Sequence, residues 1–200
     1  MKQSIKKAVT AIAAIMIMVS CSNQSSNKAN AQPTLSNKKI LVVYYSWSSG
    51  GNTRNMAQQI QVATGADIFE IVPEKTYPTE YRACVDQAKE EIENKHKPAI
   101  KGVVANFDSY DIVIVGSPNW WSTIAPPVAT FLTSYDFKGK IIMPFMTHEG
   151  TQMGNTVDVI KELCPNSTVT DGLPIRGGNV RDESTASNIA KWLSENDVIK

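Results

Sequence analysis

The hydrophobic pattern from residue 38 onward alternates between short apolar runs and longer segments with helical periodicity. The runs Ile40-Leu-Val-Val and Ile112-Val-Ile-Val are almost continuously apolar, as is typical of strands buried on both faces of a parallel sheet. The expected strands are 40–45, 67–72, 111–116, 141–145 and, with the weakest pattern, 168–170. The expected helices are 53–64, 81–95, 124–132, 154–163 and 183–193. Strands that alternate with helices predict an α/β domain whose parallel sheet is covered on both faces.

Three loops that follow expected strands carry the residues most suited to binding. They are Ser46-Trp-Ser-Ser-Gly-Gly-Asn-Thr53, Ser117-Pro-Asn-Trp-Trp-Ser122 and Met146-Thr-His-Glu-Gly-Thr151. Ligands of open α/β sheets bind beyond the carboxyl ends of the strands, where the strand order reverses. The first loop opens a helix, and a helix N-terminus directs backbone N–H groups and positive dipole charge at an anion. The second loop supplies two aromatic rings, so the three loops predict a ligand with a phosphate at one end and a flat ring at the other.

The first 37 residues differ in composition from the rest of the chain. Three lysines precede the apolar run 8–19, which is too short to span a bilayer comfortably and therefore predicts an export signal. Residues 18–21 resemble the cleavage box of bacterial lipoproteins, which implies a signal peptide at 1–20 and lipidation of Cys21. An ordinary secretory signal and an uncleaved anchor helix are the alternatives. Residues 21–37 are rich in Ser, Asn, Gln, Lys and Ala, as in a flexible tether, so the folded domain is expected at 38–200.

Charge and cysteine content exclude some classes of function. Removal of residues 1–20 takes three lysines from the 20 basic side chains and leaves 17 against 19 acidic ones, so no basic field for nucleic acid is expected. An exported protein permits a disulfide between Cys84 and Cys164, but their spacing leaves the pairing open. No Cys or His residues have metal-ligand spacing, and we expect no metal site. No serine–histidine–carboxylate grouping is recognisable either, which makes a hydrolase a weak hypothesis.

The motifs and their order resemble the flavodoxin-like FMN-binding family, and within it the short flavodoxin-type proteins often found as bacterial lipoproteins. The resemblance covers residues 38–200 and rests on residues 44–48, 51–53, 116–121, 125–128, 144–145 and 147–150. It implies a three-layer sandwich around a five-stranded parallel sheet in the order 2-1-3-4-5, with FMN at the switch point. One departure is that Ser49 and Gly50 are two extra residues relative to the usual phosphate loop of that family.

The resemblance also implies which residues bind FMN. Those expected around the phosphate are Ser46, Ser48, Gly51, Asn52 and Thr53. Those expected beside the flavin ring are Pro118, Asn119, Trp120 and Trp121, and those along its pyrimidine edge are Thr147, His148, Glu149 and Gly150. Trp120 is favoured to stack on the ring. Simpler alternatives are an N-cap role for Asn52 or Thr53, tryptophans that pack beneath their loop, and His148 as a cap.

The expected function is redox chemistry at the outer face of a bacterial membrane. One-electron flavodoxins often have a glycine beside the flavin, and this chain has none in the loop after Gly116, so the resemblance favours two-electron chemistry, as in quinone or flavin reductases. Expected partners are a redox protein or a small electron donor or acceptor, such as a quinone or NAD(P)H, together with the membrane through the lipid. A tyrosine of the segment 77–81 could approach the flavin, or that segment is a plain turn. An electron carrier and a non-redox binding module on the same fold are the other hypotheses.

Overall fold

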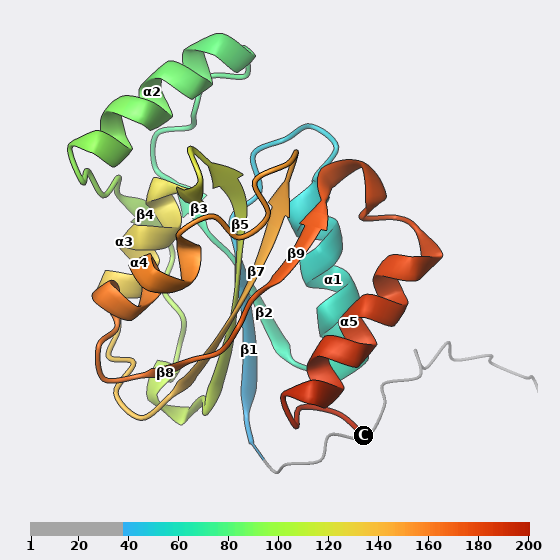
Figure 1. Ribbon diagram of the computed structural model, residues 1–200. Coiled ribbons are helices and arrows are strands. Elements are labelled where there is room, and N and C mark those ends of the chain that lie inside the picture. The colour runs from blue at the N-terminus through green and yellow to red at the C-terminus, as the bar shows by residue number, and fades with distance from the viewer. Residues whose placement is uncertain (1–37) are drawn as a thin grey trace, which may run out of the picture.

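The computed structural model describes residues 38–200, which form a parallel sheet between two layers of helices (Figure 1). The main path of the sheet is β2 (Asp67–Glu70), β1 (Ile40–Tyr44), β5 (Ile112–Trp120), β7 (Ile141–His148) and β8 (Thr168–Val169). A further strand, β9 (Leu173–Arg176), also pairs with β7, and all these pairings are parallel. The α/β class and the order 2-1-3-4-5 are therefore confirmed, with β8 and β9 sharing the fifth position.

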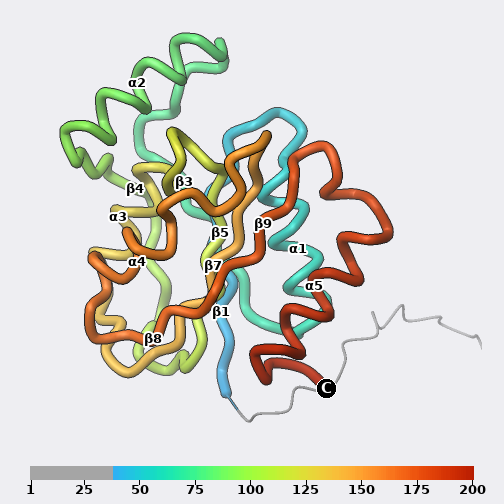
Figure 2. The backbone as a smooth tube through the Cα atoms, viewed as in Figure 1, coloured from blue at the N-terminus to red at the C-terminus, as the bar shows by residue number. Residues whose placement is uncertain are grey.

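Helices cover both faces of the sheet, and one helix lies beyond its edge. In Figure 1, α1 (Asn52–Thr64) and α5 (Glu183–Glu195) cover one face, and α3 (Pro126–Ser134) and α4 (Thr156–Leu163) cover the other. The helix α2 (Tyr81–Glu93) projects past the ends of the strands, and the backbone tube in Figure 2 shows it standing out from the rest of the domain. A short antiparallel pair, β3 (Val72–Pro73) and β4 (Ile100–Lys101), flanks this helix in the sequence. Because α2 projects past the ends of the strands, it lies at the edge of the sheet where a ligand of this fold would bind.

The core consists of two clusters, one on each face of the sheet. Successive residues of β1 alternate between them, because side chains point to opposite faces along a strand. Leu41 and Val43 belong to the cluster under α3 and α4, whereas Ile40 and Val42 belong to the cluster under α1 and α5. Both faces are thus apolar, which explains why the central strands read as continuous hydrophobic runs.

Several predicted boundaries are wrong for physical reasons. The strand β5 continues four residues past Gly116 because the chain folds back as β6 (Thr123–Ile124), so the expected loop 117–122 is a β-hairpin. The helix α3 begins at Pro126 instead of residue 124, because prolines suit the first turn of a helix. The strand β9 was not predicted, because Gly172 and Pro174 hide its pattern.

The signal peptide 1–20, lipidation at Cys21 and the tether 21–37 lie outside the described residues and stay predictions. In the described part of the chain, no helix combines the length and the apolar character that a membrane crossing requires.

Candidate functional site

A cleft of about 670 Å³ opens at the carboxyl edge of the sheet. Its volume lies within the range of small-molecule sites, roughly 300–1,000 Å³. The three loops named above contribute most of its wall. The predicted site residues that line it are Ser48, Asn52, Thr53, Pro118, Asn119, Trp120, Trp121, Thr147, His148, Glu149 and Gly150. The structure therefore brings these residues together in one cleft, whereas Ser46 and Gly51 lie outside its wall.

The first loop leaves the N-terminus of α1 without a side-chain cap. The N-cap residue is Gly51, which has a left-handed backbone with φ +61° and makes no side-chain capping bond. A glycine fits this position because it has no Cβ to clash. The first N–H groups of a helix have no partner within the helix. Here the Asn52 N–H donates to the Ser48 Oγ atom at 3.4 Å, and Asn52 and Thr53 both line the cleft. The alternative in which Asn52 or Thr53 is the N-cap is wrong, and the helix end is open to an anion.

Hydroxyl groups complete this end of the site. The Ser46 Oγ atom is buried and has no hydrogen-bond partner among the described residues. A buried polar group without a partner is unfavourable, so the orphan hydroxyl is consistent with an absent ligand. The hydroxyls of Thr53 and Thr147 lie 2.8 Å apart in a buried hydrogen bond. That bond ties the start of α1 to the end of β7, which joins the predicted phosphate end to the predicted ring end.

The tip of the β5–β6 hairpin forms another part of the wall. Trp121 and Ser122 have φ values of +53° and +64°, and they connect the paired residues Trp120 and Thr123. Two successive left-handed residues between paired strands make a type I′ turn, in which Asn-Gly is the usual sequence. Asn119 stabilises the turn: its Oδ1 accepts from the Ser122 backbone N–H at 3.0 Å.

The two tryptophans have different surroundings. Trp120 is partly buried, and its ring packs at steep angles on Tyr45, Tyr77 and Trp47, with centroid distances of 5.6, 4.9 and 6.3 Å. Trp121 is 51% exposed and lies against α2, where its indole N–H donates to the Val85 carbonyl at 3.1 Å. Both rings line the cleft, and Trp120 also packs against the core cluster under α3 and α4. Whether Trp120 stacks on a ligand stays a prediction.

The end of β7 places charged groups at the opposite rim. His148 lines the cleft, and its buried Nδ1 has no hydrogen-bond partner in the described part of the chain. Burial lowers the pKa of His148 below 6.5; the Glu149 carboxylate opposes this shift and the Arg176 guanidinium adds to it. The Arg176 Nε atom lies 3.8 Å from a Glu149 oxygen, and both side chains are largely exposed. His148 is thus a neutral imidazole above pH 6.5, with an unused ring nitrogen beside the cleft.

A family model described as flavodoxin matches residues 39–196. The chain belongs to the flavodoxin family. Among solved structures, a protein assigned as a flavoprotein from Bacteroides eggerthii is 30% identical, with a TM-score of 0.69, over 80% of this chain and 98% of its own. A flavoprotein from Lactobacillus acidophilus, solved in complex with FMN, is 28% identical, with a TM-score of 0.62, over 78% of this chain and 98% of its own. No protein of curated function matches the chain significantly.

This flavodoxin-family chain also builds the cleft from residues that, apart from a tyrosine of the segment 77–81, the sequence did not indicate. The residues of α2 that line it are Tyr81, Cys84, Val85 and Ala88, and Gly177 adds the segment after β9. A Cβ on Gly177 would lie 2.4 Å from Glu149 Oε1 and 2.8 Å from Asn52 Nδ2, so only glycine fits there without a shift. The sequence feature at this position is the pair Gly177-Gly178, but two adjacent glycines do not indicate which residues they will contact.

Burial keeps the thiols and phenols of the core neutral, among them Cys84 beside the cleft. Cys84 and Cys164 are both free and buried, so the possible disulfide does not form. Burial raises the pKa of each thiol to about 11. Tyr77 is buried beside Trp120 and donates a hydrogen bond to Glu91 of α2, and burial followed by this bond raises its pKa. Of the two tyrosines in the segment 77–81, Tyr77 therefore packs beneath the site, whereas Tyr81 lines the cleft and is 72% exposed.

Proposed function

We propose that this protein binds FMN in the cleft and carries out redox chemistry with it. The observation that carries the proposal is that the N-terminus of α1 lies at one part of the cleft and the Trp120 ring at another, while the orphan Ser46 hydroxyl belongs to the loop that leads into α1. FMN has a phosphate at one end and a flat ring at the other, which matches the positions of the α1 N-terminus and the Trp120 ring. The solved complex of the Lactobacillus acidophilus flavoprotein with FMN supports the same cofactor here.

Each wall of the cleft has a distinct task in this proposal. The hydroxyls of Ser46 and Ser48, with the N–H groups that open α1, hold the phosphate by hydrogen bonds and helix-dipole charge. Trp120 covers a face of the ring and keeps water from it. His148 and the backbone beside it lie along the polar edge of the ring. Bound FMN supplies the electron transfer, and the chain controls which molecules reach it.

We further propose that the electron acceptor is a small flat molecule, such as a quinone, that enters between α2 and the β5–β6 hairpin. Tyr81 and Trp121 line the cleft, and their side chains are 72% and 51% exposed. Exposed aromatic rings beside a cleft are typical of sites that bind flat apolar ligands. NAD(P)H or a protein donor would supply the electrons. An electron carrier without its own substrate is the alternative.

Absorption spectroscopy tests the cofactor. The full-length protein, incubated with FMN and passed through gel filtration, should keep flavin absorption bands at a stoichiometry near one. Trp120→Leu should lose affinity for FMN by about fivefold, because a ring contact is worth on the order of 1 kcal/mol. The control Val62→Ala, in the last turns of α1, should bind FMN as the wild type does. A colourless protein that ignores added FMN would leave only a binding module.

Turnover separates an enzyme from a carrier. The FMN-loaded protein should oxidise NADH or NADPH when a soluble quinone is supplied, and Trp121→Ala should raise KM for the quinone more than it lowers kcat. Reduction by a protein donor, without turnover by either nicotinamide or quinone, would support the carrier instead.

We propose a membrane location on the sequence of the first 37 residues. Lipidation at Cys21 would anchor the domain to the extracytoplasmic face of a bacterial membrane, near lipid-soluble quinones. Cys21→Ser should move the protein from the membrane fraction to the soluble fraction, whereas the neighbouring Ser22→Ala should not. Equal fractionation of both variants would contradict the anchor.

A further inference from the structure

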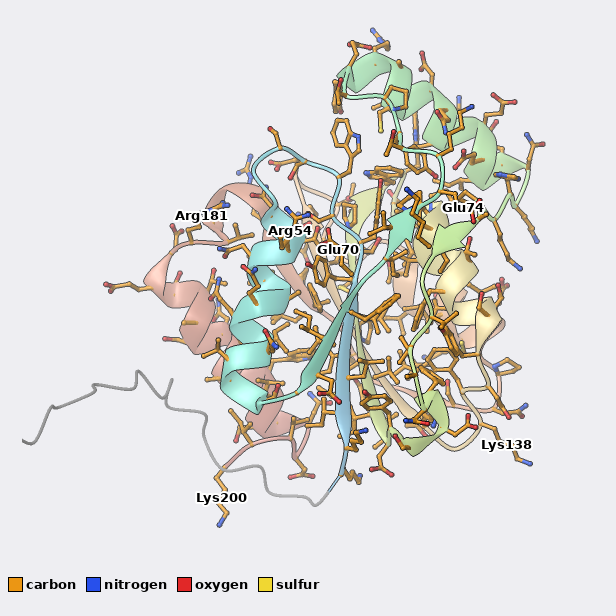
Figure 3. The ribbon with its side chains drawn as sticks, turned by 180° about the vertical axis from the view of Figure 1, so that it is seen from behind. Arg54, Glu70, Glu74, Lys138, Arg181 and Lys200 are labelled. Atoms are coloured by element: carbon orange, nitrogen blue, oxygen red, sulfur yellow. The ribbon has the colours of Figure 1, made fainter. Side chains whose placement is uncertain are left out.

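An arginine from the far end of the chain contacts the phosphate loop. Arg181 follows the short 3₁₀ helix η2 (Gly177–Asn179), 129 residues from Asn52 along the chain. Its Nη1 donates to Asn52 Oδ1 at 3.2 Å, and its Nη2 donates to the Gly50 carbonyl. Figure 3 shows Arg181 approaching the start of α1 from a separate segment of the chain. The guanidinium therefore lies at the loop where an anion is proposed to bind.

The positive charge of Arg54, the neighbouring cation at this helix end, is already neutralised by an ion pair with Glu70. The Arg54 Nη2 atom lies 2.5 Å from a Glu70 oxygen, and Tyr44 donates to the other oxygen of Glu70 at 3.1 Å. Arg181, in contrast, bonds to neutral oxygens, and within residues 38–200 no carboxylate lies within ion-pair distance of it. The acidic residues Asp182 and Glu183 follow it in sequence at the start of α5. Arg181 is thus the cation of the loop whose charge no contacting carboxylate neutralises.

The contacts of Arg181 also explain how the lengthened loop keeps its shape. Gly50 is one of the two residues that are extra relative to the usual loop, and it is exposed. The loop has its own turn bond, from the Gly51 N–H to the Ser48 carbonyl at 2.9 Å, and the hydrogen bond from Arg181 to the Gly50 carbonyl ties it to a distant segment as well. A guanidinium carries five N–H groups, more than these two bonds need, so donors remain for a phosphate oxygen.

We infer that Arg181 is a positioning residue for the lengthened phosphate loop and the cation by which the site prefers a phosphorylated flavin to riboflavin. The inference rests on the proposed function. Its two parts belong together, because the bonds to Gly50 and Asn52 also place the guanidinium beside the loop that is proposed to hold the phosphate. Charge-assisted bonds to a phosphate are stronger than neutral ones, and a cation is the usual means of selecting the charged ligand.

The test measures dissociation constants for FMN and riboflavin by quenching of flavin fluorescence, with the full-length protein. Arg181→Gln should bind FMN about tenfold more weakly and riboflavin within about twofold of wild type, whereas Arg181→Lys should be intermediate for FMN. The matched control is Arg82→Gln, which removes the same charge from an exposed arginine of α2, whereas Arg181 contacts the phosphate loop. It should leave both constants unchanged.

Salt dependence separates charge from shape. Raising ionic strength should weaken FMN binding to wild type and to Arg181→Lys more than to Arg181→Gln, because screening acts only where the charge contributes. Equal weakening of both flavins, or equal salt slopes in Arg181→Gln and wild type, would overturn the inference and leave FMN binding intact. A wild-type protein that binds neither flavin would overturn the proposed function and the inference together. If Arg181→Gln does not fold, Arg181→Lys decides through its affinities: weaker binding of FMN with riboflavin binding unchanged supports the inference, and equal weakening of both flavins overturns it.

Discussion

The left-handed pair Trp121 and Ser122 shows how single residues shape the wall of the cleft. A left-handed backbone is unfavourable for residues with a Cβ by about 1 kcal/mol or more. Contacts on both sides offset this strain: the Ser122 carbonyl accepts from Asn155 N–H at 2.8 Å, and Asn119 Nδ2 donates to the Gln152 carbonyl at 2.9 Å. A Cβ on Gly154 would lie 2.1 Å from the Ser122 carbonyl oxygen, so the hairpin tip and the loop before α4 fit closely.

Ser122→Gly should therefore stabilise the protein by about 0.5–1 kcal/mol, because glycine adopts a left-handed backbone without strain. Urea unfolding at pH 7.5 measures the change. Ser122→Ala is the control, since it keeps the Cβ and should stay within about 0.5 kcal/mol of wild type. A loss of stability in the glycine variant would show that the turn is not strained at this position.

His148 makes a second prediction at this scale. Its pKa is lowered by burial, so the unfolded chain takes up a proton below pH 6.5 before the folded protein does. The contribution of His148 to stability is therefore present above pH 6.5 and is lost as pH falls below that value. The imidazole resonances in an NMR titration should show a pKa below 6.5, assigned with His148→Gln because His96 is the other histidine. A midpoint above 6.5 would contradict the burial of this ring.

At the scale of elements, α2 is the helix least embedded in the fold. It buries Cys84 and Ala88, whereas α1 buries five residues, among them Met56 and Ile60. Side-chain contacts attach it to the cleft: Trp121 donates to its Val85 carbonyl, and Lys89 lies 5.2 Å from the centre of the Trp121 ring. An element held by a few contacts opens more easily than the core, so α2 is suited to admit and release a ligand.

Trp121→Ala should loosen α2 without unfolding the domain. Amide hydrogen exchange in residues 81–93 should become about tenfold faster, whereas exchange in α1 and α5 should stay unchanged. Trp121→Phe keeps a ring under Lys89 but lacks the indole N–H, so it should give an intermediate rate. Uniform acceleration across all helices would instead mean that Trp121 stabilises the whole domain.

The elements also show what the sequence could predict. The apolar runs at 40–45 and 111–116 indicated buried parallel strands, because both faces of β1 and β5 are core. The hairpin at residues 119–124 was not predictable, because Trp-Ser is an unusual sequence for a type I′ turn. The division of the fifth strand into β8 and β9 was not predictable, because each segment is too short to show a clear strand pattern.

Some parts of the site could also be predicted from the sequence, and others could not. Loops directly after strands were predictable, because the fold places those ends together. Contributions from Arg181, Gly177 and α2 depend on tertiary contacts between segments far apart in the chain, and a single arginine or glycine in a sequence does not indicate its partner.

At the scale of the whole molecule, the cluster under α3 and α4 contains the thiols of Cys84 and Cys164 and the phenols of Tyr45, Tyr77 and Tyr110. These groups remain uncharged while they are buried. Burial raises the pKa of Cys84 and Cys164 from 9.0 to about 11, and burial together with a hydrogen bond to Asp67 raises that of Tyr110 to about 12. The pKa values of Tyr45 and Tyr77 are raised as well. The buried thiols and phenols on this face of the sheet therefore stay neutral to a higher pH than they would in the unfolded chain.

Alkaline pH should therefore destabilise the protein, because these buried groups ionise more readily in the unfolded chain than in the folded protein. For each thiol, the unfolded chain ionises near pH 9 and the folded protein near pH 11, so the stabilising contribution is complete below pH 9 and is lost as pH rises to 11. The expected loss is roughly 2 kcal/mol for each thiol. Urea unfolding at pH 7.5, 9 and 10.5 measures it. Cys164→Ala should be less stable at pH 7.5, but its stability should decline less steeply with pH because one ionising group is gone. Equal slopes in the variant and the wild type would show that Cys164 does not contribute to the decline.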